Sequence, residues 1–334
     1  MSSVNVSSVN VSSVNVSSAN VSSVNASSWS WSSLTLTGFW DPGPLRSLWF
    51  LLLLLFYLLL LGSNLLVIAA IVLDRTLHQP MYVLLASLLV NQLCGSGAIF
   101  PFLLHHLLRR EHVVSHAACF AQVFFLFFYG NVQILTLAAM SYDRYVAICR
   151  PLQYHARMSP RRTRRLLLLV WLLPLLEVGF MVSLSAPLRL CGTHVSKVYC
   201  DNYSVVKLAC GDTTLNNVYG LLYTCLMLLS VPALILYSYV RIIRVCVSSS
   251  SARRKALGTC APHLASLLNL SLACFCELLM TRFDVSDVPK SVRVFLSLFF
   301  LTCPPLFDPL VYGLSLRRVR RSCQALLLSD TRSA

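Results

Sequence analysis

The sequence predicts an all-α membrane protein, a bundle of seven transmembrane helices followed by a short amphipathic helix. Of its 334 residues, 57% are hydrophobic and only 12% are charged, whereas a soluble domain carries about 25% charged residues. Seven apolar segments each reach the roughly 20 residues that a membrane helix needs. Arginine and lysine collect in alternate connections between them, so membrane topology accounts for the formal charge of +15, and we exclude nucleic acid as a partner.

Residues 1–46 form a tail built on a Ser-Ser-Val-Asn-Val unit, repeated between residues 2 and 26. Such a polar, low-complexity tract cannot bury enough surface to offset its ordering entropy, so we expect disorder. The repeat creates acceptor triplets for N-glycosylation at Asn5, Asn10, Asn15, Asn20 and Asn25. We predict a glycosylated extracellular tail; the alternative is that the repeat expanded by slippage and only some acceptors are used.

Residues 47–313 form the membrane region. The predicted spans are 47–73, 82–104, 119–143, 165–187, 216–244, 257–280 and 292–313. Most arginine and lysine residues lie on the side that follows the first, third, fifth and seventh spans. The positive-inside rule makes this side cytoplasmic, which places the amino terminus outside and the carboxyl terminus inside. We expect a multi-pass protein of the plasma membrane.

Residues 314–334 form a cytoplasmic tail. Four arginines, at 317, 318, 320 and 321, precede an apolar run from Ala325 to Leu328. This pattern predicts a short amphipathic helix within Ser315–Leu328 that lies on the inner leaflet. The alternative is a merely basic tail end.

Four cysteines lie on the predicted outer side. They are Cys119, Cys191, Cys200 and Cys210. The outside of a cell is oxidising, so we expect two disulfides, but spacing cannot choose among the three possible pairings. Asn202 in the same loop begins another glycosylation triplet.

An acid and an arginine stand side by side at the inner end of the third span, in Asp143-Arg144-Tyr145. Charges near lipid are costly and mark function or an interface. One interpretation is a snorkelling arginine at a membrane exit. The other is a switch, in which Arg144 is held by Asp143 and then released towards a cytoplasmic partner.

Five stretches match the motifs of one family. The first, Met140–Cys149, differs from the family's Met-Ala-Tyr-Asp-Arg-Tyr-Val-Ala-Ile-Cys only by Ser141. The others are Leu77–Tyr82, Ser238–Ile242, Lys255–Leu264 and Pro304–Gly313. In this order and topology they make about residues 45 to 320 resemble a rhodopsin-like (class A) G-protein-coupled receptor, and more narrowly an olfactory, or odorant, receptor of the fish type.

The resemblance implies a function. The receptor would bind a small-molecule odorant in the outer half of the bundle and activate a stimulatory olfactory-type heterotrimeric G protein, which raises cyclic AMP. It implies that the switch is formed by Asp143, Arg144, Tyr145, Pro309 and Tyr312. It also implies a Cys119–Cys200 disulfide, which leaves Cys191 to pair with Cys210.

Helical spacing and the position of known receptor pockets suggest ligand contacts. The candidates are Phe127, Gly130, Asn131, Ile134, Tyr219, Tyr223, Ser271 and Phe275. No acid lies between Cys119 and Met140, so a biogenic amine is not expected. Glu177 or Glu277 could still hold a cation, and Arg293 an anionic odorant.

A polar group of the inner bundle departs from the usual receptor pattern. The second span carries Asn91 and Gln92 where many related receptors have an acid, and the seventh carries Asp308 in place of asparagine. We hypothesise that Asp308 supplies the buried acid, that Asn91 or Gln92 faces it, and that this polar group binds sodium. The resemblance implies that Asn64 is the family's first-helix asparagine, and we include it in the group. The alternative is a carboxyl that is simply hydrogen-bonded.

Other functions are weaker readings of the sequence. A different rhodopsin-like receptor, for a small lipid or a peptide, is the nearest alternative. A transporter should show internal repeats, and none is present. An enzyme needs convergent catalytic groups, and the four histidines from His105 to His116 are irregularly spaced. We therefore expect no enzymatic activity, no metal centre and no cofactor.

Overall fold

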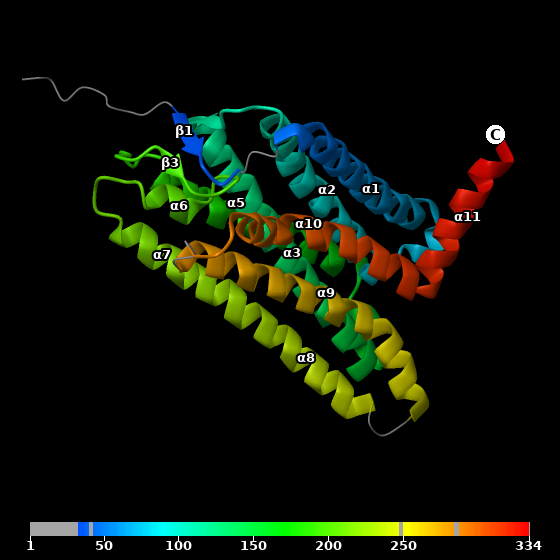
Figure 1. The fold of residues 1–334 in the computed structure, drawn as a ribbon. Coiled ribbons are helices and arrows are strands. Elements are labelled where there is room, and N and C mark those ends of the chain that lie inside the picture. Colours follow the sequence, from blue (N-terminus) through cyan, green and yellow to red (C-terminus); the bar gives the residue numbers. More distant parts are fainter. Residues whose placement is uncertain (1–32, 40–42, 247–249, 284–286, 334) are drawn as a thin grey trace, which may run out of the picture. The chain divides into compact units, whose positions relative to one another are not determined.

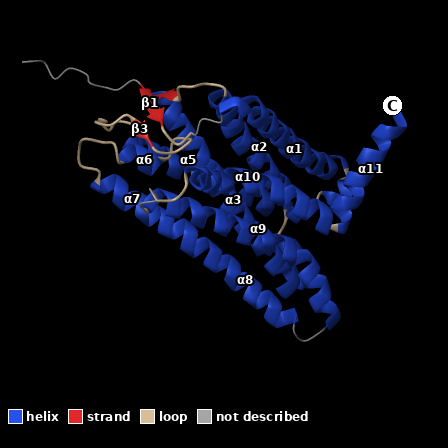
Figure 2. Ribbon diagram, viewed as in Figure 1, coloured by secondary structure: helices blue, strands red, loops and turns tan. Residues whose placement is uncertain are grey.

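The computed structural model describes residues 33–39, 43–246, 250–283 and 287–333. The predicted glycosylation sites from Asn5 to Asn25 lie outside these residues. The described part is mostly helical, with a small sheet (Figures 1 and 2). Its elements are β1 (Ser33–Leu36), η1 (Gly43–Leu45), α1 (Arg46–Leu73), η2 (Arg75–Leu77), α2 (Pro80–Leu107), β2 (Val113–Ser115), α3 (His116–Cys149), η3 (Pro151–Gln153), α4 (Tyr154–Arg157), α5 (Pro160–Ser185), β3 (His194–Val195), α6 (Asn202–Val206), α7 (Thr214–Cys225), η4 (Leu226–Ser230), α8 (Val231–Cys246), α9 (Ser250–Arg282), α10 (Lys290–Ser315) and α11 (Arg317–Ser333).

The seven predicted spans correspond to α1, α2, α3, α5, the pair α7 and α8, α9, and α10. Among the described residues, six helices are each long and apolar enough to cross a membrane. The fifth span is missing from that set because the π-helical segment η4 divides it into α7 and α8. The prediction of a seven-helix bundle is confirmed.

Helix α3 forms the middle of the bundle. It contacts α2, α5, α8 and α9, and half of its residues are buried. Helix α1 instead leaves Leu51, Leu55 and Leu58 about half exposed. Apolar side chains on such a face suit contact with lipid, which offers no hydrogen bonds.

A three-stranded sheet covers one end of the bundle, the end that also carries both disulfides (Figure 1). We call it the disulfide end and the opposite one the Arg144 end. Strand β1 lies in the middle, antiparallel to β2 and parallel to β3. Leu34 and Leu36 of β1 are buried.

The sheet corrects one part of the predicted disordered tail. Its last described residues are ordered as β1, and α1 begins at Arg46. Gly38, which follows β1, donates its N–H to the carbonyl of Lys197 over 3.2 Å, and a Cβ there would lie 2.2 Å from the Lys197 carbonyl carbon. Two apolar side chains and a glycine therefore fix this segment against the loops.

Helix α11 packs against the Arg144 end through one face. Leu316 before it, and Val319 and Cys323 within it, are buried, whereas Leu327 and Leu328 are exposed. The Ser322 hydroxyl donates to the Asp74 carboxylate next to η2, and this bond lowers the pKa of Asp74. The predicted amphipathic helix is present.

Candidate functional site

Two disulfides fasten the loop between α5 and α7 to the disulfide end. Cys119 of α3 is bonded to Cys200, and Cys191 is bonded to Cys210, which is the pairing that the family resemblance implies. The Gln122 side-chain carbonyl also accepts the backbone N–H of Cys200 over 2.8 Å. The loop is therefore held directly over the middle helix.

This fold buries a predicted glycosylation site. Asn202 begins the short helix α6 and is only 7% exposed. A glycan acceptor has to lie on the surface. The structure therefore does not support the predicted glycan at Asn202, because tight packing of the loop beside Cys200 hides a triplet that the sequence presents as an outer-loop site.

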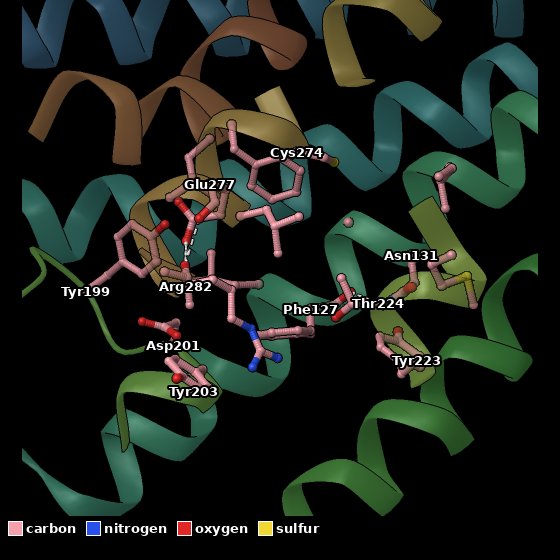
Figure 3. A pocket seen from close by; sticks show the side chains of 18 of the residues that line it. Phe127, Asn131, Tyr199, Asp201, Tyr203, Tyr223, Thr224, Cys274, Glu277 and Arg282 are labelled. Atoms are coloured by element: carbon pink, nitrogen blue, oxygen red, sulfur yellow. Dashed lines mark hydrogen bonds between the residues drawn. The ribbon is translucent and has the colours of Figure 1, made fainter. Parts of the chain in front are cut away.

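A cavity of about 190 Å³ lies beneath the loop, between the helices at the disulfide end. We call it the first cavity; Figure 3 shows its side chains. Most of its lining is apolar, with polar groups concentrated towards the loop. The lining residues are Leu126, Phe127, Gly130, Asn131, Ile134, Tyr199, Cys200, Asp201, Tyr203, Tyr223, Thr224, Met227, Cys274, Glu277, Leu278, Thr281, Arg282, Phe300 and Leu301.

Helix α3 faces the first cavity as its spacing predicts. The four α3 candidates, Phe127, Gly130, Asn131 and Ile134, all line it, and so does Tyr223 of α7. A Cβ on Gly130 would lie 2.9 Å from Cζ of Phe300, so this glycine makes room for the Phe300 ring of α10.

Three other candidates do not line the first cavity. Tyr219 turns towards α5, where its hydroxyl donates to the Glu177 carbonyl over 3.1 Å. Ser271 and Phe275 of α9 are exposed on the outer surface of the bundle. Both faces of α9 carry apolar residues, so hydrophobic periodicity could not tell its inward face from its lipid face.

The cavity face of α9 carries Cys274, Glu277, Leu278 and Thr281 instead. Glu277 is the residue from which the sequence could have indicated this inward face, because an acid in a membrane span seldom faces lipid. It does not stand alone to bind a cation, since the Lys197 ammonium lies 2.5 Å from its carboxylate.

Lys197 of the loop joins a buried cluster of charges at the edge of the first cavity. Its ammonium also donates to the Thr281 hydroxyl over 2.6 Å and lies 3.3 Å from the Asp201 carboxylate. Burial alone would lower the pKa of Lys197, but Asp201 and Glu277 outweigh it and raise that pKa. Lys197 therefore stays charged and ties the loop to α9, a role that nothing in the sequence indicated.

Two further charged groups occupy different places. The Arg282 guanidinium stacks on the Tyr203 ring, 4.2 Å from its centroid, at the loop side of the first cavity. Arg293 lines a separate cavity and not the first one. Two of the four histidines between His105 and His116 pack around an aromatic side chain: the Phe39 ring stacks on His112 at 4.2 Å and on His106 at 5.8 Å.

The charged pair at the Arg144 end joins a buried carboxylate to an arginine whose side chain is 15% exposed. Arg144 donates to Asp143 through Nε over 2.9 Å and also through Nη2, and the Asp143 side chain is fully buried. Tyr154 of α4 donates to the other Asp143 oxygen over 2.9 Å. Sequence reasoning missed Tyr154, which lies outside the family motifs. Arg144 is thus held by its neighbour, as a switch in its resting state requires.

Tyr312 of α10 forms the second contact at this end. Its hydroxyl lies 3.1 Å from Nδ1 of His263 in α9, and both residues are buried. His263 belongs to the matched stretch Lys255–Leu264 and could have been singled out there. Pro309 is buried one turn before Tyr312, whereas Tyr145 is half-buried beside the core.

The predicted polar group comes together in the middle of the bundle. Oδ2 of Asp308 accepts from the side-chain amides of Gln92, over 2.5 Å, and Gln133, over 2.9 Å. Asn91 donates to the Tyr129 carbonyl over 3.0 Å. Asn64 stands apart and donates to the Pro305 carbonyl over 2.7 Å. Gln133 of α3 was missed, because an amide in a long helix gives little signal.

Comparisons with known proteins agree with this architecture. A family model described as olfactory receptor matches residues 53–330, from α1 into α11. Olfactory receptor 11A1 from Homo sapiens is 33% identical over 301 residues, covering 89% of this chain and 94% of its own. Olfactory receptor 1E16 from Mus musculus is 35% identical over 292 residues, covering 86% and 92%.

A third relative, olfactory receptor 52K2 from Homo sapiens, is 32% identical over 259 residues, covering 75% of this chain and 80% of its own. These three relatives are mammalian, so the fish type stays a prediction. The chain is a multi-pass membrane protein and, as a receptor of this kind, not an enzyme. The long match and the seven-helix bundle together show that this chain belongs to the olfactory receptor family of rhodopsin-like G-protein-coupled receptors.

Proposed function

We propose that this receptor binds a small odorant in the first cavity and activates a stimulatory olfactory-type G protein at the Arg144 end. One observation carries the proposal: helix α3 lines the first cavity and also carries the Asp143–Arg144 pair near its other end, which is at Cys149. A ligand that moves α3 therefore acts on both ends through one rigid element. The disulfide end would be extracellular and the carboxyl terminus cytoplasmic.

The lining of the first cavity suggests the ligand's chemistry. Its wall is mainly apolar near Leu126, Ile134 and Met227, while Asp201 and Arg282 stand at the loop side. About 190 Å³ is small beside the roughly 300–1,000 Å³ of typical ligand pockets. We infer a small, mostly apolar molecule that carries one polar group towards the loop.

The switch would work by a shift between two states. A ligand favours the active state only if it binds that state more tightly. In the resting state, Asp143 holds Arg144 and Tyr312 holds His263. Separation of α9 from α10 at this end would break the second contact and open the bundle. Arg144 would then exchange Asp143 for the G protein as its partner. The neighbouring residues Tyr145 and Pro309 would belong to the same moving surface.

The first test is a cyclic-AMP reporter screen of cells that express the full chain, using volatile odorants, steroids, bile salts and amino acids. A response to any of them supplies the agonist. Arg144→Ala should reduce the agonist response to that of untransfected cells, because the contact to the G protein is lost. Arg161→Ala, an exposed arginine at the start of α5, is the control. A normal response in Arg144→Ala cells at equal surface expression would refute the switch.

The second test locates the odorant. Gly130→Ala places a methyl group against the Phe300 ring and narrows the first cavity. We expect the agonist concentration for half-maximal response to rise roughly fivefold, which corresponds to about 1 kcal/mol of overpacking. Phe275→Leu on the exposed face of α9 should leave it unchanged. The opposite pattern would move the ligand to the outer surface of α9.

We also propose that Asp308 and its neighbours bind sodium. The side-chain oxygens of Asn91 and Gln92 are buried and accept no hydrogen bond from the described residues. Hard cations prefer oxygen ligands of this kind. The donor set of one carboxylate and two amide oxygens therefore fits a monovalent cation.

A further inference from the structure

A second cavity of about 210 Å³ lies at the disulfide end, between β1's continuation, the loop and the start of α10. The segment from Lys197 to Tyr199 separates it from the first cavity, because Lys197 and Val198 line the second while Tyr199 lines the first. Its lining residues are Thr37, Gly38, Ser196, Lys197, Val198, Lys290, Arg293, Val294 and Ser297.

The second cavity is lined by cations and hydroxyls. Lys197, Lys290 and Arg293 contribute to it, and no carboxylate belongs to its described lining. The Lys197 ammonium is already paired with Glu277 and Asp201 on the other side of the wall. Among the described residues, neither Lys290 nor Arg293 forms an ion pair, so their two positive charges are available to a ligand.

Arg293 gives the most direct sign of an occupant. Its Nε is buried and donates no hydrogen bond to any of the described residues. Burying a donor without an acceptor is unfavourable, so native structures satisfy nearly all such groups. A guanidinium Nε–H that has no acceptor among the described residues, beside a polar cavity, favours a ligand with a negatively charged oxygen.

The start of α10 adds to the same field. Lys290 is its first residue, and Arg293 follows one turn later, so both stand at the amino-terminal end of a 26-residue helix. Free backbone N–H groups and the helix dipole favour anions at such an end. The positive charges, the start of α10 and the Arg293 Nε–H without an acceptor among the described residues all favour an anion in the second cavity.

We propose that the second cavity is a binding site for a small oxyanion, either an organic carboxylate or a free inorganic ion such as phosphate. Arg293 donates to the oxyanion from the wall, and Lys290 pairs with it at the mouth. Because the oxyanion would contact Lys197, which lies between the two cavities, it would also change the affinity of the first cavity for an odorant. By thermodynamic reciprocity, a bound odorant would change the affinity of the second cavity for the oxyanion by the same factor. The site goes beyond odorant binding and does not depend on it.

The test follows thermal unfolding of the purified full-length receptor in lipid nanodiscs, as sodium butyrate or sodium phosphate replaces sodium chloride at constant sodium and ionic strength. At least one anion should raise the transition temperature saturably. Arg293→Gln should weaken its apparent affinity by about tenfold or more, and Lys290→Gln by less. Arg189→Gln, an exposed arginine of the same end outside the cavity lining, should leave it unchanged.

The different anions and variants distinguish the kind of oxyanion that binds and the cavity that binds it. Saturation with butyrate alone identifies an organic carboxylate, and saturation with phosphate alone a free inorganic oxyanion. Lys290→Gln keeps the test decisive if Arg293→Gln does not fold. Saturation by neither anion, or saturation that survives both substitutions, overturns the proposal. An effect lost in Arg282→Gln but kept in Arg293→Gln places the anion in the first cavity and overturns it too.

Discussion

Asp308 concentrates the polar chemistry of the bundle in one side chain. A single oxygen accepts amide donors from both α2 and α3, through Gln92 and Gln133. A buried carboxylate costs much free energy unless hydrogen bonds or a cation satisfy it. Asp308 therefore links α10 to α2 and α3, and it is the carboxylate that would bind the proposed sodium ion.

Asp308→Asn tests that role. A ligand that binds only the folded state at ten times its dissociation constant stabilises it by about 1.4 kcal/mol. Sodium, exchanged against choline at constant chloride, should therefore raise the unfolding temperature of the purified receptor saturably, and Asp308→Asn should abolish this effect. Asp287→Asn, an exposed acid before α10, is the control. Sodium stabilisation that persists in Asp308→Asn would leave Asp308 a merely hydrogen-bonded carboxyl.

At the scale of the element, helices α2 and α3 approach each other closely at one glycine. A Cβ on Gly95 would lie 2.4 Å from the ring of Tyr129, which is itself fully buried. Rings cannot shift in a full core without moving their neighbours, so overpacking is costly. The close approach also places Asn91, one turn earlier, beside the Tyr129 carbonyl.

Gly95→Ala should destabilise the receptor by about 1–3 kcal/mol, as is usual for overpacked cores. Gly97→Ala is a matched control on the same helix, because a Cβ there meets nothing within 4 Å. Thermal unfolding of the two purified variants measures the difference. Equal transition temperatures would mean that the Tyr129 ring relaxes at no cost.

Sequence patterns predicted the elements better than their faces. Long apolar runs are sufficient to locate the spans, and the α3 candidates line the first cavity. The α9 candidates failed, because Ser271 and Phe275 face outwards. Lipid accepts the same side chains as a protein core, so an apolar helix carries no mark of its inward face except a charge such as Glu277.

At the scale of the whole molecule, three distant segments close the disulfide end. Strand β1 pairs with the connection before α3 and with the loop after α5, and the Cys119–Cys200 disulfide binds that same loop to α3. No sequence pattern predicted β1, because a short strand next to a low-complexity repeat cannot be distinguished from the repeat in the sequence. Tertiary pairing alone gives it order.

Leu34→Ser together with Leu36→Ser should loosen this end. Both side chains are buried in the wild type, and burial of each leucine contributes about 1.5–3 kcal/mol. We expect a lower unfolding temperature and a weaker odorant response at equal surface expression. Val113→Ser changes an exposed side chain of β2 and serves as the control. If the double variant matched it, β1 would contribute nothing to the closed end.

The position of β1 also has a consequence for biosynthesis. The ribosome makes this strand before any membrane helix, yet its antiparallel partner follows the second span and its parallel partner follows the fourth. Until the loop after α5 has emerged, β1 is an unpaired strand with free backbone groups, the kind of edge that other chains can join. This three-stranded sheet can therefore be completed only after more than half of the chain has been synthesised and its first four spans have brought the three strands to the same end of the bundle.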